Sequence, residues 1–221
     1  MLLQNISGAI FDMDGTLVNS LWGWDELWRW CGERFLGVQN YRPDEAIDKA
    51  VRTMVLADAM DYIHTHCGFG RDGKELLDHF NEILPALYEE KFDLKPGVRE
   101  FLEALRARGI PMCIASATEP AFVEIARKRH DFDRYFSAYL SCATIGKGKE
   151  HPDIYEAALK TLGTERETTW VFEDSFVALE TASSIGMPTV GIYDRYNFEQ
   201  ERLRRSATHY VAKDETMMKL L

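Results

Sequence analysis

The sequence predicts an α/β fold in which helices cover both faces of a doubly wound parallel sheet, with an all-helical segment inserted after the first strand. Two observations support this prediction. Short apolar runs alternate with segments of helical hydrophobic periodicity, which is the pattern of successive strand–helix–strand units. The alternation is interrupted once, from about Asn19 to Asp93, where every periodic stretch is helical and no strand is expected.

The expected strands are short apolar runs bounded by turn residues or polar residues. The first, Ala9–Phe11, lies close to the start of the chain and leads into an acidic turn. Five later runs have the same character, and we expect all of them to join a parallel sheet. They are Pro111–Ala115, Ala138–Leu140, Thr169–Phe172, Thr189–Ile192 and His209–Val211.

Amphipathic stretches between these strands are expected to be the crossover helices. Gly109 and Gly163 directly follow two of them, at the position where glycine commonly ends a helix in the left-handed conformation. Gly186, followed by Met187 and Pro188, ends the last one in the same manner. The predicted helices are Val98–Arg108, Pro120–Arg129, Pro152–Leu162 and Phe176–Ile185.

The inserted segment contains three helix-like stretches. The first is expected to bury one apolar face, and two more run from Asp44 to His66 and from Lys74 to Phe92. The alternating pattern returns after Leu94-Lys95-Pro96-Gly97. The residues on the apolar face of the first stretch are Leu21, Trp24, Trp28, Cys31 and Phe35.

Composition restricts the classes of partner. At 221 residues the chain can bury a substantial core, and a net charge of −10 argues against nucleic acid and against anionic membranes, which attract basic surfaces. Residues 1–8 are too short and too polar for a signal peptide, and no apolar run approaches the length of a membrane span. The four cysteines form no C-x-x-C pair, so reduced thiols and a cytoplasmic protein are expected. They are Cys31, Cys67, Cys113 and Cys142.

The acidic turn after the first strand offers two carboxylates at one strand end. Asp12 and Asp14 are two positions apart, and Gly15 permits the tight turn that follows them. One carboxylate can attack an electrophile while the other moves a proton. Both also supply the hard oxygen ligands that magnesium prefers. An isolated pair of this kind is more often an acidic surface turn. Whether it is a catalytic site here depends on the motifs in the rest of the chain.

Polar groups follow two later strands in the same way. Ser116-Ala117-Thr118 comes after the second strand, and Glu173-Asp174-Ser175 comes after the strand that begins at Thr169. Lys149 stands three residues before Pro152, where a helix is expected to begin. Because ligands bind beyond the carboxyl ends of parallel strands, we expect these side chains to converge with the acidic turn.

These four motifs, in this order, resemble those of the haloacid dehalogenase-like superfamily, within its phosphatase and phosphoglucomutase branch that carries a helical cap. The resemblance covers essentially the whole chain. It implies a Rossmann-like core domain of residues 1–18 and 94–221, and a mobile helical cap domain of residues 19–93 over the active site. One departure is Ala178, which stands where the family often has glycine.

The resemblance implies an aspartyl-phosphate mechanism. Asp12 is expected to be the nucleophile, and Asp14 to protonate the leaving oxygen and then deprotonate the attacking water. Ser116, the amide of Ala117 and Lys149 are expected to bind phosphoryl oxygens, and the charge of Lys149 would stabilise the transition state. Lys149, not Lys147, has the spacing before the helix that matches the family pattern.

The same resemblance implies Mg²⁺ as cofactor. Its expected ligands are a carboxylate oxygen of Asp12, the backbone carbonyl of Asp14 and the carboxylate of Asp174. Glu173 would assist either directly or through water. Attack of one anion on another requires charge compensation, and the bound cation would provide it.

The expected function is a phosphatase for a small phosphorylated metabolite, for which a sugar phosphate is one candidate. The alternative is a phosphotransferase resembling β-phosphoglucomutase; that branch places a histidine twelve positions after the nucleophile, where this chain has Trp24. Asp14 and Glu173-Asp174 argue against a dehalogenase, and the complete motif set argues against a non-catalytic binding module. Trp22 lies off the apolar stripe and is a candidate for substrate contact. The oligomeric state stays open, and a monomer is compatible with the sequence.

Overall fold

The computed structural model describes residue 3, residues 5–52 and residues 54–221. The chain forms two compact units, one composed of Met1–Ser20 with Phe92–Leu221 and the other of Leu21–Lys91. Within the described residues the first unit contains all the strands, and the second is built from helices and their connections. An α/β unit with an all-helical insertion is the fold class that the sequence predicts.

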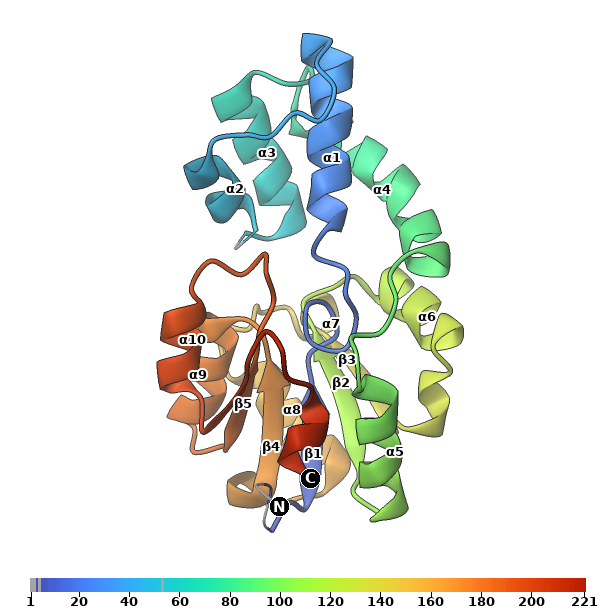
Figure 1. Ribbon diagram of the computed structural model, residues 1–221, viewed down its shortest axis with the longest axis vertical. Helices are drawn as coiled ribbons and strands as arrows, with labels where there is room; N and C mark the ends of the chain where they lie inside the picture. Colours follow the sequence, from blue (N-terminus) through green and yellow to red (C-terminus); the bar gives the residue numbers. More distant parts are fainter. Residues whose placement is uncertain (1–2, 4, 53) are drawn as a thin grey trace. The chain divides into compact units, whose positions relative to one another are not determined.

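A six-stranded sheet in which all neighbouring strands are parallel forms the centre of the first unit (Figure 1). Its strands are β1 (Gly8–Phe11), β2 (Met112–Ser116), β3 (Ala138–Ser141), β4 (Thr169–Glu173), β5 (Thr189–Ile192) and β6 (His209–Val211). They lie in the order β3-β2-β1-β4-β5-β6. The chain builds outward from β1 on one side and then crosses to β4 on the other. The switch point therefore lies between β1 and β4, where open α/β sheets bind ligands.

Helices connect the successive strands of this unit. They are α5 (Val98–Ala107), α6 (Pro120–Arg129), α7 (Cys142–Ile145), α8 (Asp153–Leu162), α9 (Phe176–Ser184) and α10 (Gln200–Ser206). The four predicted crossover helices agree with α5, α6, α8 and α9 to within one residue at each end. Gly109 and Gly163 adopt the left-handed conformation expected there, with φ of +70° and +65°. Helices α7 and α10 were not predicted, because one is a single turn and the other buries only Leu203.

Both faces of the sheet are covered. On one face Ile10 and Val171 belong to a buried cluster with residues of α8 and α9. On the other face the rings of Phe11 and Phe172 stack with centroids 4.3 Å apart, and Phe101 of α5 meets both rings edge-on. Ile10 and Phe11 lie on opposite faces of the sheet, as do Val171 and Phe172, because successive residues of a strand point to opposite faces. This packing makes the sheet doubly wound, as predicted.

The second unit contains α1 (Gly23–Cys31), α2 (Glu45–Val51), α3 (Leu56–Cys67) and α4 (Gly73–Glu90). A π-helical turn, Gly32–Leu36, continues α1. The helix-like stretch from Asp44 to His66 consists of two helices, because Val55 adopts an extended conformation (φ −60°, ψ 142°) that separates α2 from α3. On α1, Trp28 and Cys31 are buried as expected, and Leu27, which was not expected, is buried with them.

The start of α4 lies unusually close to α3. A Cβ atom added to Gly73 would lie 2.6 Å from the backbone nitrogen of Asp61 and 2.7 Å from its Cα atom. Backbone cannot give way as a flexible side chain can. We therefore expect Gly73→Ala to lower the free energy of unfolding of this unit by about 1–3 kcal/mol, the usual cost of overpacking.

Tryptophan fluorescence during urea unfolding measures this effect, because four of the five tryptophans lie between residues 22 and 30. Asn81→Ala is the matched control, since Asn81 is an exposed residue of the same helix. Equal stability of the two variants would contradict the close approach of α3 and α4.

The two chain connections at the edge of the first unit are hydrogen-bonded to each other. The Lys95 amide donates to the Leu17 carbonyl at 2.8 Å, and the Asn19 amide donates to the Asp93 carbonyl, also at 2.8 Å. Arg129, at the end of α6, donates a hydrogen bond to the Phe92 carbonyl at 2.9 Å and so holds the segment in which the chain returns from the insertion. The entry to the insertion and the return from it thus form one short antiparallel pair.

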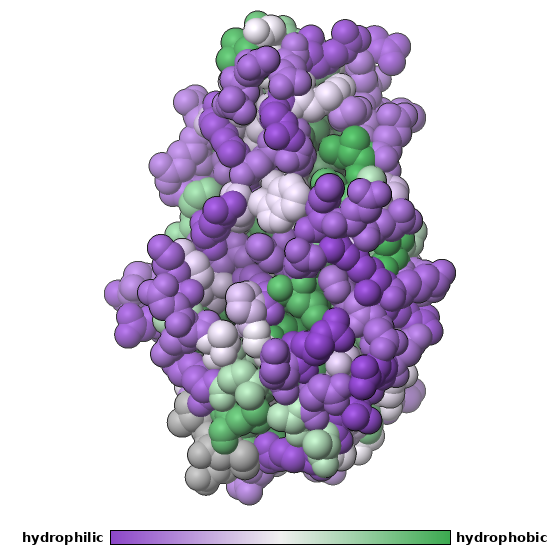
Figure 2. Space-filling view, turned by 45° about the vertical axis from the view of Figure 1, so that its right-hand side comes forward, coloured by the Kyte–Doolittle hydropathy of each residue, from purple (hydrophilic) through white to green (hydrophobic). Residues whose placement is uncertain are grey.

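Hydrophilic side chains predominate on the face drawn in Figure 2, and hydrophobic side chains form small separate areas there. Within the described ranges, the exposed large apolar side chains are scattered along the sequence: Leu36, Val38, Val55, Val177, Phe198 and Met218. Isolated exposed apolar residues of this kind are normal for protein surfaces. Among the described helices, none combines the length and the apolar character that crossing a membrane requires.

Candidate active site

Three carboxylates meet beyond the ends of β1 and β4. Asp12 directly follows β1, Glu173 is the last residue of β4, and Asp174 comes next. Each offers an oxygen atom, and these atoms all lie within 4.8 Å of one another. All three residues are buried, with at most 7% of their surface exposed. The strands bring them together because β1 and β4 are parallel neighbours whose carboxyl ends lie at the same edge.

Lys149 neutralises part of this charge. Its Nζ atom lies 2.5 Å from Oδ1 of Asp12 and also contacts Oε1 of Glu173. Burial alone would lower the pKa of this ammonium group, but the two carboxylates raise its pKa well above the usual value, so Lys149 is charged. One cation thus bridges two strand ends.

Even with Lys149 beside them, the three carboxylates carry more negative charge than this one cation balances. Burial, together with the charge of Asp12, raises the pKa of Glu173 to about 7, although Lys149 opposes the rise. Burial and the charges of Asp12 and Glu173 also raise the pKa of Asp174 well above its usual value. A bound cation stabilises the ionised form of buried carboxylates that lie this close together.

The donor set fits a hard divalent cation. Oδ2 of Asp12 is buried and has no hydrogen-bond partner among the described residues, and an unpartnered buried carboxylate oxygen is costly unless a ligand satisfies it. Carboxylate oxygens are the ligands that Mg²⁺ prefers. Both oxygens of Glu173 already have partners: Oε1 contacts Lys149, and Oε2 accepts a hydrogen bond from the Ser175 amide at 3.0 Å. Asp12 therefore keeps an oxygen for a cation, whereas both oxygens of Glu173 are already engaged.

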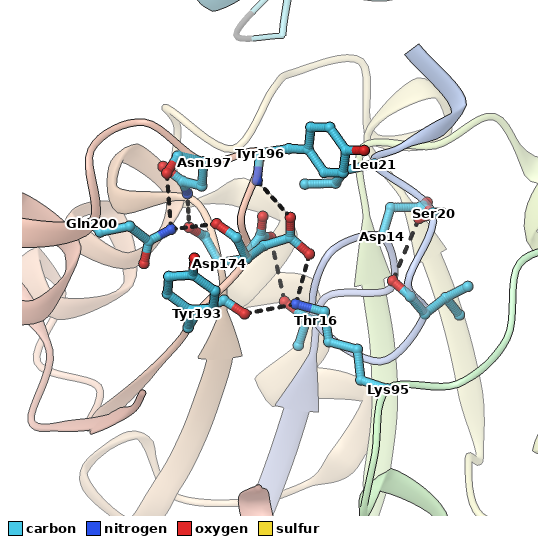
Figure 3. A network of polar contacts seen from close by, with 12 residues as sticks. Asp14, Thr16, Ser20, Leu21, Lys95, Asp174, Tyr193, Tyr196, Asn197 and Gln200 are labelled. Carbon is cyan, nitrogen blue, oxygen red and sulfur yellow. Dashed lines mark hydrogen bonds and ion pairs between the residues drawn. The ribbon is translucent and has the colours of Figure 1, made fainter. Parts of the chain in front are cut away.

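Asp14 is oriented by two hydroxyl groups. Ser20 donates to Oδ1 at 2.5 Å, a contact drawn in Figure 3, and Thr118 donates to Oδ2 at 2.6 Å. Ser116, the last residue of β2, is buried, and its Oγ atom accepts a hydrogen bond from the Thr118 amide at 3.0 Å. Ala117 between them is exposed. Thr118 was not predicted as a site residue, although it stands in the polar triplet that follows this strand.

The loop after β5 supports Asp174 from the other side. The side-chain amide of Asn197 donates to the Asp174 carbonyl. Asp194, which is buried, forms an ion pair with Lys95 at 2.8 Å, and Lys95 also donates to the Tyr193 carbonyl at 2.8 Å. Figure 3 shows Asn197, Tyr193 and Lys95 around Asp174. Sequence reasoning missed Lys95, Asp194 and Asn197, although Asp194 follows a predicted strand end by two residues.

Trp22 belongs to the second unit, whereas the strand-end residues belong to the first. It occupies the N-cap position of α1 and is half-buried. Of its neighbours, Trp24 packs against Phe80 with ring centroids 5.7 Å apart, and Trp30 stacks on His79 at 3.7 Å. The rings of Trp24 and Trp30 thus contribute to packing within this unit.

Comparison with known proteins adds an independent line of evidence. A family model described as haloacid dehalogenase-like hydrolase matches residues 6–186, which is most of the chain. The chain belongs to the haloacid dehalogenase-like hydrolase family. The resemblance drawn from the four motifs is thereby confirmed, and this protein is an enzyme of the hydrolase class.

Relatives of this hydrolase cover nearly its whole length. The phosphorylated carbohydrates phosphatase of Thermotoga maritima is 25% identical over 220 residues, which cover 96% of this chain and 97% of the relative. Hexitol phosphatase B of Escherichia coli (strain K12) is 28% identical over 189 residues, covering 85% and 83%. The crystal structure of CbbY from Rhodobacter sphaeroides in complex with phosphate aligns with a TM-score of 0.77 over 93% of each chain at 21% identity. At 21% sequence identity, this similarity shows that the two proteins share a fold.

Proposed function

We propose that this hydrolase is a magnesium-dependent phosphatase that acts on a small phosphorylated metabolite through an aspartyl-phosphate on Asp12. The observation that carries the proposal is the environment of Asp12. Lys149 holds one oxygen of its carboxylate, and the other oxygen is buried and has no hydrogen-bond partner among the described residues. A nucleophile needs both a fixed orientation and a free electron pair. Among the relatives, those named as phosphatases of phosphorylated carbohydrates and hexitols make a sugar phosphate the first candidate substrate.

The proposed reaction has two steps. The Asp12 carboxylate attacks phosphorus, the bond to the leaving oxygen breaks, and Asp14 gives that oxygen a proton. Asp14 then takes a proton from a water molecule as the water attacks phosphorus, and the bond to Asp12 breaks with release of inorganic phosphate. Lys149 and the Ser116 hydroxyl, with the Ala117 amide, bind phosphoryl oxygens in both steps.

Mg²⁺ would be held by Asp12, the backbone carbonyl of Asp14 and Asp174. When bound, it supplies positive charge that offsets the repulsion between the carboxylate and the phosphoryl group. In this proposal Glu173 acts chiefly on Lys149, because both of its oxygens have protein partners. Loss of magnesium should leave the protein folded, since Lys149 already forms ion pairs with two of the three carboxylates, Asp12 and Glu173.

We also propose that residues 19–93, the helical insertion, act as the cap that closes the site and contacts the substrate beyond its phosphoryl group, with Trp22 as a candidate contact. Support comes from its compact helical build and from the paired connections that join it to the rest of the chain. Lids of this kind exclude bulk water during the reaction.

Phosphate release provides the test. The purified protein is incubated with a panel of sugar phosphates, nucleotides and other small phosphate esters in the presence of magnesium, calcium or EDTA. We expect release from at least one sugar phosphate with magnesium, loss of activity in EDTA, recovery on adding magnesium, and weak activity with calcium, whose looser coordination suits an octahedral site poorly. Undiminished activity in EDTA would refute the magnesium requirement.

The mutase alternative is tested with β-glucose 1-phosphate and a trace of β-glucose 1,6-bisphosphate. Trp24 occupies the position where that branch carries a histidine, and its ring packs on Phe80. We therefore expect phosphate release to exceed formation of glucose 6-phosphate. The opposite ratio would favour a phosphotransferase.

A further inference from the structure

The turn after β2 is fixed by hydrogen bonds on both sides of Thr118. Its amide donates to Ser116 Oγ at 3.0 Å, and its carbonyl accepts from Ser141 Oγ at 2.8 Å. Ser141 ends β3 and is the direct register partner of Ser116 on the neighbouring strand. The backbone of Thr118 is therefore anchored by the ends of two strands, and this restricts where its side chain can point.

That side chain reaches Asp14, which is 104 positions away in the sequence. The Thr118 hydroxyl donates to Oδ2 of Asp14 at 2.6 Å, while Ser20 donates to Oδ1 at 2.5 Å. Both lengths lie at the short end of the range for O–H···O hydrogen bonds. Two short bonds on opposite oxygens fix the plane of the carboxylate as well as its position.

We infer that Thr118 is a positioning residue that holds Asp14 in the orientation for proton transfer to the leaving oxygen. The inference rests on the proposed function, in which Asp14 moves that proton. Thr118 does not itself touch the substrate in this account and keeps its own proton throughout. Ser116 and Thr118 belong to one turn. The backbone of this turn therefore positions the Ser116 hydroxyl, which binds the phosphoryl group, and, through Thr118, the proton donor Asp14. It thereby fixes the distance between these two groups.

A positioning role predicts dependence on the leaving group. An alcohol leaving from a sugar phosphate needs a proton as the bond breaks, whereas p-nitrophenolate is a stable anion that needs little protonation. Disorienting Asp14 should therefore slow sugar phosphate cleavage and spare the aryl ester. A residue that only stabilised the turn would affect both esters alike, because Ser116 would be displaced for both.

The experiment compares kcat/KM of the wild type, Thr118→Val and Thr118→Ser on glucose 6-phosphate and p-nitrophenyl phosphate, with magnesium present. For Thr118→Val we expect a loss of about 10- to 100-fold on the sugar phosphate and less than about 3-fold on the aryl ester, given the usual contribution of general acid catalysis. Thr118→Ser keeps the hydroxyl and should stay within about 3-fold of wild type on both. Thr161→Val is the matched control, because its hydroxyl donates only locally, to the Ala157 carbonyl, on exposed α8 surface.

Ser20→Ala provides a second variant should Thr118→Val not fold. It removes the hydroxyl that donates to the other oxygen of Asp14 and leaves the turn after β2 intact, so the same selective loss is expected. An equal loss on both esters, or no loss on either, would overturn the positioning role. Wild-type activity is measured first: a folded wild type inactive on every ester of the panel overturns the proposed function and this inference with it, whereas an active wild type with unselective variants overturns the inference alone.

Discussion

Asp12→Asn is expected to abolish turnover, with a loss of at least ~10⁴-fold in kcat, as is usual when a catalytic nucleophile is removed. The substitution is nearly isosteric, but an amide oxygen is a poor nucleophile and a weaker ligand for a divalent cation. The described contacts of Lys149 with Glu173 remain, so the strand ends keep one of their ion pairs. The fold should therefore be retained.

Single-turnover and steady-state phosphate release measure this loss, and thermal unfolding establishes that the variant is folded. Asp153→Asn is the matched control, because Asp153 also pairs with a lysine, Lys147 at 2.7 Å, but lies outside the carboxylate cluster. Substantial phosphate release from a folded Asp12→Asn protein would remove Asp12 from the role of nucleophile. Isothermal titration with magnesium adds a readout that does not depend on activity, and weaker binding is expected.

Lys149→Met should reduce both activity and stability. Methionine has similar length without the charge, so Asp12 and Glu173 would lose the cation that bridges them. We expect kcat to fall by ~10²–10³-fold, the usual effect of removing one electrostatic contact to the transition state. In EDTA the free energy of unfolding should fall by about 3 kcal/mol, as is typical when one partner of a buried ion pair is deleted.

Magnesium should recover part of that stability, since a bound cation neutralises carboxylates that the lysine no longer reaches. Lys147→Met is the control: Lys147 lies two residues away and forms an exposed pair with Asp153, so a change within about 1 kcal/mol is expected. Similar effects of the two substitutions on turnover would contradict the assignment of Lys149. So would a Lys149→Met protein as stable in EDTA as the wild type.

Much of the core could be predicted because the signals are local. Apolar runs such as Ala9–Phe11 and Thr169–Phe172 identify buried strands, and parallel strands bring their carboxyl ends to one edge. Asp12 and Asp174 could therefore be placed together although they lie far apart in the sequence. The cover on both faces follows from the same alternation, whereas the order of the strands was not predicted.

Other parts of the site depend on contacts that no local pattern contains. The bond from Thr118 to Asp14 requires a particular turn and a particular rotamer, and the pair of Lys95 with Asp194 joins two loops that meet only in the folded chain. The break between α2 and α3 was missed for a similar reason, because an extended residue at Val55 leaves the helical periodicity almost unchanged. Polar residues are common in loops, and the sequence alone does not show which of them contact the site.

The antiparallel pairing of Leu17–Asn19 with Asp93–Lys95 bears on how such enzymes diversify. The insertion leaves and rejoins the first unit at neighbouring points, so the sheet keeps its connectivity whatever length of chain lies between them. Domain insertion is best tolerated where the two ends of the inserted piece lie close together. Residues 21–91 therefore form a cassette: a recombination event or a protein engineer can exchange it for another helical segment while the carboxylates, Lys149 and the β2 turn stay in place. If the insertion acts as the proposed cap, replacing that cassette changes the substrate preference and leaves the strand-end residues as they are.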